Sequence, residues 1–417
     1  MKSFFSFLTP RIYADAAASM PPSRRSLLKF EELSRLYGNP GGLHAEAVRA
    51  KEALEGARAE VARSIGAHAD EIVFTSGGTE GNNLAIEGVL RPLLGAGERA
   101  HAVTLRIEHP SVLEPLIALE EEGLEATYLP VGPEGVASAK EVGETIEANT
   151  ALVSVQAVNS EIGTLQPVRE IAKEVRRVRT LRPFNRIQGR PEEFEGQQAQ
   201  GGLPLYFHTD ASQAPLWLPL NVEKLGVDLL TLDGQKFGAP RGVGALYVRR
   251  KTALAPRILG GGQERGIRSG TENVALAGAF AVALTEAQEG AEKRSKRIAD
   301  VRDYLLEEIR KVLPATVNGS LERRVANNLN VSLPSLEGQM AVVALNERGV
   351  ATSTRSACSE GDEGPSYVVE SLGPAKGFKK KERAQNAIRF TLLPTATYTQ
   401  MDRIVRALFD VALLHHQ

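Results

Sequence analysis

The chain has 417 residues, enough for two domains, and its hydrophobic fraction of 42% can supply a sizeable core. Its 50 Lys and Arg balance 51 Asp and Glu, and a net charge of −1 argues against a dedicated nucleic-acid-binding protein. The single cysteine, Cys358, excludes an internal disulfide, and we expect neither a metal site nor a membrane span. The apolar start, residues 4–8, is too short for a signal peptide, so we expect a cytoplasmic protein.

Apolar runs of strand character alternate with helical patterns from about residue 45 to 250. The apolar spacing predicts helices over 46–65, 84–94 and 168–178, and strands over 71–75, 102–106, 126–131, 151–158, 205–209, 229–233 and 244–249. This alternation predicts crossover connections and a mostly parallel sheet, with functional sites at the carboxyl ends of its strands.

The pattern changes near residue 270. The remainder predicts helical structure over 273–313, then a strand, a helix, a strand and a terminal helix over 328–332, 339–348, 388–393 and 399–415. This order is typical of a second, smaller α+β domain. Residues 183–204 lack apolar periodicity and are rich in Gln, Gly, Glu and Arg, which indicates a surface insertion in the first domain.

Three polar segments follow predicted strands. Thr75–Glu80 contains a Gly-Gly turn that suits phosphate binding, although an ordinary strand-to-helix turn capped by Thr79 has the same sequence. Asp210 ends a strand, where an aspartate often caps the next helix. Lys236 lies between glycine-rich turns, which makes it a candidate imine-forming amine, but most lysines are simply solvated.

Cys358 lies among small, polar, Gly and Pro residues rather than among apolar ones. A structural cysteine normally has apolar neighbours, and an exposed thiol is a liability unless it is used. The surroundings therefore favour a reactive thiol on an exposed loop.

These segments occur in the same order as in a known family. The chain resembles the class V branch of pyridoxal-phosphate (PLP) enzymes, specifically the NifS/IscS-like cysteine desulfurases. The resemblance is carried by residues 13–17, 37–40, 75–80, 108–109, 159–163, 210–213, 234–236, 268–271, 356–358, 365–367 and 388–390. It covers nearly the whole chain apart from the insertion.

The resemblance implies an α/β protein with the PLP-dependent transferase fold (fold type I). A large domain, 20–272, would hold a mostly parallel seven-stranded sheet. Residues 1–19 and 273–417 would form the small α+β domain that carries the cysteine loop. The resemblance also implies a homodimer.

Each site residue is implied by the family motif that it matches. Catalytic roles would fall to Lys236, which holds the cofactor as a Schiff base, to Cys358, which accepts sulfur, and to His109, which stacks on the ring and moves protons. The other cofactor-binding residues would be Asp210 at the pyridine nitrogen, Gln213 and Ser160 at the ring hydroxyl, and Gly78, Thr79, Asp233, Gln235 and, across the dimer interface, Thr271 at the phosphate. Arg389 and Asn39 would bind the substrate carboxylate.

The implied reaction removes sulfur from L-cysteine, leaves a persulfide on Cys358 and releases alanine. The eight-position step from Cys358 to Ser366 resembles the group that passes sulfur to scaffold or tRNA-thiolation proteins. We expect no direct nucleic-acid contact.

Three positions depart from the family pattern: Ser160 replaces an asparagine, Gln235 a histidine and Asp233 a serine. Asp233 matters most, because two like charges about 4 Å apart repel by roughly 4 kcal/mol at an effective dielectric constant near 20. Asp233 must turn away, for instance toward Arg241, or carry a proton, or weaken phosphate binding.

Two other interpretations stay open at this point. The chain could be another class V enzyme, such as a selenocysteine lyase or an aminotransferase-like enzyme, which needs no persulfide on Cys358. It could also be a cofactor-impaired homologue that acts as a binding partner, as the changes at Asp233 and Ser160 suggest.

Overall fold

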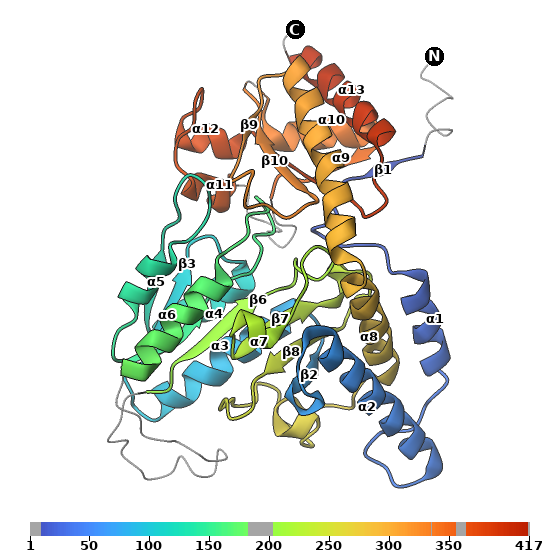
Figure 1. Cartoon of the computed structure of the whole chain (residues 1–417), viewed down its shortest axis with the longest axis vertical. Helices are drawn as coiled ribbons and strands as arrows, with labels where there is room; N and C mark the ends of the chain where they lie inside the picture. Colours follow the sequence, from blue (N-terminus) through green and yellow to red (C-terminus); the bar gives the residue numbers. More distant parts are fainter. Residues whose placement is uncertain (1–9, 182–202, 335, 356–363, 416–417) are drawn as a thin grey trace.

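The computed structural model describes residues 10–181, 203–334, 336–355 and 364–415 (Figure 1). Cys358 and nearly all of the 183–204 insertion lie outside these ranges, so their predicted roles are not addressed by the structure. No helix in the described ranges is both long enough and apolar enough to cross a membrane.

A seven-stranded sheet forms the centre of the larger part of the molecule. Its strands run in the order β2-β8-β7-β6-β5-β3-β4. All neighbours are parallel except that β8 runs antiparallel to both β7 and β2, which confirms the predicted mostly parallel sheet. The strands are β2 (Ile72–Thr75), β3 (His101–Leu105), β4 (Glu125–Leu129), β5 (Thr150–Ser154), β6 (Tyr206–Asp210), β7 (Leu229–Asp233) and β8 (Gly244–Val248).

Helices cover both faces of this sheet (Figure 1), and the inner strands are accordingly buried. Every residue of β3, β5, β7 and β8 is buried, whereas the edge strand β4 is half-buried throughout. The helices of this part are α1 (Arg24–Leu33), α2 (Ala45–Ile65), α3 (Gly78–Gly95), α4 (Pro110–Glu120), α5 (Ala139–Thr145), α6 (Val168–Leu181), α7 (Val222–Leu225) and α8 (Val274–Gln288).

The C-terminal part lies above the large sheet in Figure 1. It contains an antiparallel sheet in the order β12-β10-β9 and a separate parallel pair, β1 with β11. Its elements are β1 (Ile12–Tyr13), α9 (Ala291–Val312), β9 (Thr316–Val317), β10 (Asn328–Ser332), α10 (Gly338–Glu347), β11 (Val350–Ala351), α11 (Tyr367–Ser371), α12 (Lys380–Gln385), β12 (Ala387–Thr391) and α13 (Tyr398–His415).

The helical region predicted over 273–313 is two helices. Gly290 adopts a left-handed conformation, with φ 65° and ψ 22°, and separates α8 from α9. α8 packs against α1 and α2 beside the large sheet, while α9 packs against α13. The proposed domain boundary at residue 272 stays a prediction.

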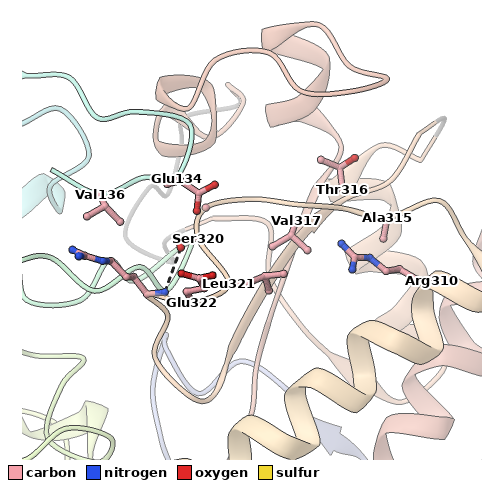
Figure 2. Close-up of a pocket in the computed structure, with 11 residues that line it drawn as sticks. Glu134, Val136, Arg310, Ala315, Thr316, Val317, Ser320, Leu321 and Glu322 are labelled. Carbon is pink, nitrogen blue, oxygen red and sulfur yellow. Dashed lines mark hydrogen bonds between the residues drawn. The ribbon is translucent and has the colours of Figure 1, made fainter. Parts of the chain in front are cut away.

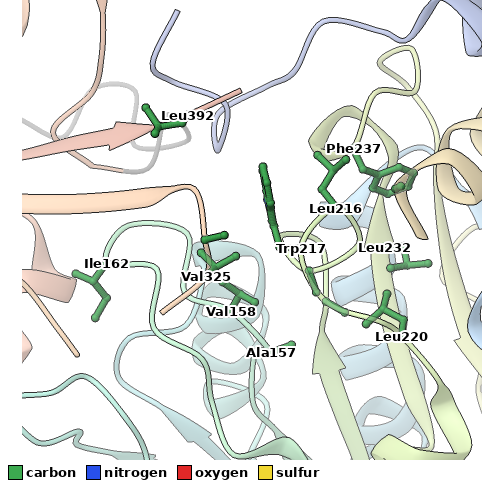
Figure 3. Close-up of a cluster of buried hydrophobic side chains, with 14 of the residues drawn as sticks. Ala157, Val158, Ile162, Leu216, Trp217, Leu220, Leu232, Phe237, Val325 and Leu392 are labelled. Carbon is green, nitrogen blue, oxygen red and sulfur yellow. The ribbon is translucent and has the colours of Figure 1, made fainter. Parts of the chain in front are cut away.

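One hydrophobic cluster connects the two parts. From the larger part it includes Val158 and Ile162, which follow β5, and Trp217. From the C-terminal part it includes Val325 and Leu392. Figure 3 shows Trp217 within this cluster, with Leu216, Leu220, Leu232 and Phe237 nearby. The large sheet and the small sheets are therefore held together by buried apolar contact above the carboxyl ends of the strands.

Candidate active site

Lys236 lies in a single turn of 3-10 helix, Gly234–Lys236, directly after β7. Its Nζ donates to the carbonyl oxygens of Ala17 at 3.0 Å and Ala18 at 2.7 Å. Gln213 Nε2 donates to the same carbonyl of Ala17 at 2.9 Å. Two predicted site residues thus meet at the N-terminal backbone segment that includes the family motif 13–17, to which the sequence analysis assigned no role.

Asp210 ends β6, next to β7 in the sheet. Its Oδ1 accepts from the Ser212 backbone N–H at 2.9 Å, and its Oδ2 accepts from Asn82 Nδ2 at 2.8 Å. Asn82 Nδ2 also donates to Ser111 Oγ, and Ser111 Oγ lies 2.8 Å from His109 Nδ1. Asn82 and Ser111 therefore connect the predicted ring-stacking histidine to the predicted pyridine-nitrogen partner, and neither was predicted.

His109 is the N-cap residue of α4. The Ser111 backbone N–H donates to His109 Nδ1 at 3.1 Å. A ring nitrogen that accepts a hydrogen bond carries no proton, so neutral His109 carries its proton on Nε2. The helix cap thereby sets which nitrogen can donate.

Glu108 is completely buried beside His109, and the backbone N–H of Gln156 donates to both of its oxygens. Burial raises the pKa of Glu108 well above its usual value, and the nearby carboxylate of Asp210 acts in the same direction. Tyr367 Oη donates to the Glu108 carbonyl oxygen and Ser366 Oγ donates to Glu161 Oε2, so α11 is attached to the large sheet beside this turn.

The turn between β2 and α3 has the features of an anion site. A Cβ atom at Gly78 would lie 3.0 Å from Ser212 Oγ, a buried hydroxyl oxygen with no hydrogen-bond partner within the ranges that the structure describes. Glu80 accepts from the Ser76 N–H and pairs with Arg268 at 2.8 Å, which ties this turn to the loop that carries Thr271. Thr79 is exposed at the start of the helix.

Arg389 lies on β12 and is 1% exposed. Its Nη2 forms an ion pair with Asp15 Oδ1 at 2.6 Å, and its Nη1 donates to the Ser160 carbonyl oxygen at 3.1 Å. The buried Nε has no hydrogen-bond partner among the described residues. Asp15, which sequence reasoning did not assign, already holds the guanidinium predicted to bind the substrate carboxylate.

Two predicted residues stand apart from these contacts. Asn39 is exposed, and its Oδ1 accepts from the Gly41 backbone N–H. Thr271 is exposed on the loop before α8. Both roles stay predictions, as does that of Cys358, which lies outside the described residues.

A cavity of about 800 Å³ lies elsewhere, beside the edge strand β9 (Figure 2). Glu134 and Val136, from the segment after β4, line it together with Arg310 of α9 and residues 315–317 and 319–323. Arg323 N donates to Ser320 Oγ at its wall. None of the predicted site residues that the structure describes lines this cavity, so it is separate from the site around Lys236.

Residues 12–182 and 197–404 match the sequence model of the family described as aminotransferase class-V. The chain belongs to this family. Cysteine desulfurase IscS of Dictyoglomus turgidum is 38% identical to it, over 91% of this chain and 89% of that protein. The mitochondrial cysteine desulfurase of Saccharomyces cerevisiae is 37% identical, over 97% of this chain and 75% of that protein.

Two solved structures extend the similarity to the fold. A NifS-like protein aligns over 97% of this chain and all of its own, with a TM-score of 0.84 and 29% identity. A structure described as SspA in complex with cysteine aligns over 93% of this chain and all of its own, with a TM-score of 0.75 and 31% identity. The expected PLP-dependent transferase fold is confirmed.

Members of the class-V family use PLP, and most of the contacts described here fit it. An amine after β7, a carboxylate at the end of β6 and a histidine after β3 lie at the carboxyl ends of strands of the same sheet. The glycine turn before α3, with the unpartnered hydroxyl of Ser212, suits the phosphate. The buried carboxyl group of Asp233 is the exception.

Proposed function

We propose that this chain is a PLP-dependent cysteine desulfurase that converts L-cysteine to L-alanine and holds the removed sulfur as a persulfide. The observation that carries the proposal is the hydrogen-bonded chain from Asp210 through Asn82 and Ser111 to His109, with Lys236 after the adjacent strand β7, in a chain whose relatives bear this name. When bound, PLP supplies an electron sink for bonds around the substrate's α-carbon.

The chain's own residues then have separate tasks. Lys236 Nζ would hold the cofactor and would be the amine that the substrate displaces. Asp210, fixed by Asn82 and the Ser212 N–H, would keep a proton on the pyridine nitrogen. His109, with its proton on Nε2, would give and take protons beside the ring.

Arg389 is proposed to orient the substrate carboxylate. Asp15 and the Ser160 carbonyl restrain its guanidinium, so the group is held in one orientation before substrate binds. Its Nε, which has no partner in the described part of the chain, is a donor available to a carboxylate oxygen. Preorganisation of this kind lowers the entropy cost of aligning the substrate.

Cys358 is proposed to accept the sulfur. Its thiolate attacks the substrate sulfur, the S–S bond forms as the C–S bond breaks, and the β-carbon takes up a proton to give alanine. The resulting persulfide would pass to an acceptor protein, either a scaffold for iron-sulfur clusters or a tRNA-thiolation protein. A chain with one cysteine suits a reducing compartment, and we propose the cytoplasm.

A homodimer is proposed from the exposed apolar side chains. Tyr37, Leu43 and Leu259 are 84%, 98% and 80% exposed. Such side chains suit a protein interface better than solvent. Thr271 is exposed on the loop that Arg268 ties to the phosphate turn, which suits a contribution to the partner's cofactor site.

Purified protein, PLP and L-cysteine provide the test, with alanine and sulfide followed together. The parent should release alanine in step with transferable sulfur. Cys358→Ala should still bind cofactor and cysteine but lose alanine release by at least about a hundredfold, or roughly 2.7 kcal/mol of barrier, because a methyl group cannot accept sulfur. Alanine release by this variant near the parent rate would favour a lyase and contradict the desulfurase.

A further inference from the structure

Asp233 places a carboxyl group against the proposed phosphate turn. It ends β7, and its side chain is buried. A Cβ atom at Gly78 would lie 3.1 Å from Asp233 Cβ and 3.5 Å from its Oδ2, and one at Gly77 would lie 3.7 Å from its Oδ1. The carboxyl group therefore lies beside the first turn of α3, where a bound phosphate would be held.

The positively charged side chains near this carboxyl group are bonded to other partners. Its Oδ2 accepts from Gln235 Nε2 at 3.1 Å, which is a neutral donor. Lys236 lies next along the turn but donates to two backbone carbonyls and would hold the cofactor. Arg241 Nε donates to Ser19 Oγ, and Arg268 pairs with Glu80 of α3, so neither arginine is bonded to Asp233. The suggestion that Asp233 turns toward Arg241 is therefore not supported.

The surroundings favour the protonated form of this group. Burial raises the pKa of Asp233, and the Asp210 carboxylate at the end of β6 adds to the rise, while Lys236 and Gln235 oppose it. The other charged residue of the adjacent turn, Glu80, is neutralised by Arg268. A phosphate bound at Gly78 would add negative charge to the same place and favour the protonated form further.

We propose that Asp233 and the phosphate of the cofactor share one proton, so that the carboxyl group donates its O–H to a phosphate oxygen. Asp233 is then a phosphate ligand rather than a defect in the site. Ser212 Oγ, buried without a partner beside Gly78, supplies a second hydroxyl donor. The inference rests on the proposed function, because it needs the cofactor site to exist.

Proton sharing links cofactor affinity to pH. Below the pKa that Asp233 has in the cofactor-free protein, the group is already protonated and binding takes up no proton there. Above that pKa, each binding event takes one proton from solvent, and the affinity falls up to about tenfold for each further pH unit. The proton returns to solvent when the cofactor leaves.

Pyridoxamine 5′-phosphate is the probe, because it has no aldehyde and forms no bond with Lys236. We would titrate this probe by calorimetry into three cofactor-free proteins: the parent, Asp233→Asn and Asp233→Ser. Each titration is made in two buffers of different ionisation enthalpy, because the difference in heat gives the number of protons taken up on binding. The range is about pH 7 to 9, above the phosphate's own pKa near 6. Pyridoxamine without phosphate serves as the matched ligand control.

The parent should take up close to one proton at the upper end of this range, and its Kd should rise with pH relative to both variants. In the parent, the Kd of pyridoxamine divided by the Kd of pyridoxamine 5′-phosphate should decrease as the pH rises. This ratio tests the proposal even if both variants fail to fold. Equal proton uptake in parent and folded variants, or a constant ratio in the parent, would overturn it. Failure of the parent to bind pyridoxamine 5′-phosphate at all would instead overturn the proposed function.

Discussion

Lys236 differs from a solvated surface lysine because its Nζ is fixed on two backbone carbonyls. We predict that borohydride treatment traps PLP covalently on the parent protein and that Lys236→Ala abolishes this trapping, because no other amine takes the same place. Lys224→Ala, at an exposed position on α7, is the matched control and should retain the trapped cofactor. Mass spectrometry of peptides checks both; trapping that persists in Lys236→Ala would assign the linkage to another lysine.

At the scale of single residues, sequence reasoning identified the charged groups but missed their partners. Lys236, Asp210 and His109 follow predicted strands and match family motifs, so their positions were foreseeable. Asn82 and Ser111 are ordinary polar residues in helices α3 and α4, and Asp15 lies in a short segment near the start of the chain. Their roles arise from contacts such as that of Asp15 with Arg389, which spans 374 residues, so the family motif that contains Asp15 does not reveal its partner.

Helix α3 packs closely against the sheet at its glycines. A Cβ atom at Gly81 would lie 2.8 Å from Cγ2 of buried Thr231 on β7, and Thr231 Oγ1 is bonded to His208 Nε2. We predict that Gly81→Ala lowers the free energy of unfolding by about 1–3 kcal/mol, because the added methyl group overpacks this contact. Gly56→Ala is the control: α2 offers open space there, and the change should add about 0.5–1 kcal/mol. Equal melting temperatures for the two variants would contradict the proposed packing.

Strand β6 contains a buried histidine, His208, whose burial favours the neutral form. Burial lowers the pKa of His208 to about 4, and its ring nitrogens are bonded to Ser154 on β5 and Thr231 on β7. In the unfolded chain the pKa of a histidine is near 6.5, so between about pH 6.5 and 4 the unfolded chain binds more protons than the folded one. The free energy of unfolding therefore falls as the pH falls through this window, by up to roughly 3 kcal/mol. Urea unfolding should show this slope in the parent and a shallower one in His208→Gln. His44→Gln, at an exposed cap, should keep the parent slope; a parent slope in His208→Gln as well would contradict the assignment.

At the scale of elements, the period of the apolar residues predicted the long, buried strands and helices best. The bounds of β7 and β10 agree with prediction to the residue. α4 was missed because it contains Pro110 and Pro115, which weaken a helical pattern even though Pro110 suits the first position of the helix. β1, β9 and β11 have two residues each, too few for any periodicity, and only their partners make them strands.

At the scale of the whole molecule, we predict a homodimer of twice the 44.9 kDa chain mass. Leu43→Glu should lower the measured mass toward that of a single chain, because a charge in a buried interface lacks a partner there. Met340→Glu, at a position on α10 that is 57% exposed, is the control and should leave the mass unchanged. Light scattering after size-exclusion chromatography measures both. A cofactor-loaded parent that shows only the single-chain mass would refute the dimer.

The ribosome delivers Ile12 and Tyr13 long before it makes their partners Val350 and Ala351. At about 5–20 residues per second the interval is on the order of 20 to 70 seconds. Residues 14–16, which lead to the carbonyls that hold Lys236, are likewise bonded to residues 351 and 391. The nascent chain can therefore complete the seven-stranded sheet before the N-terminal segment that holds Lys236 is bonded to the C-terminal part of the molecule. Capture of the cofactor in its final geometry is thus a late event, available only after the segment from 350 to 391 has emerged.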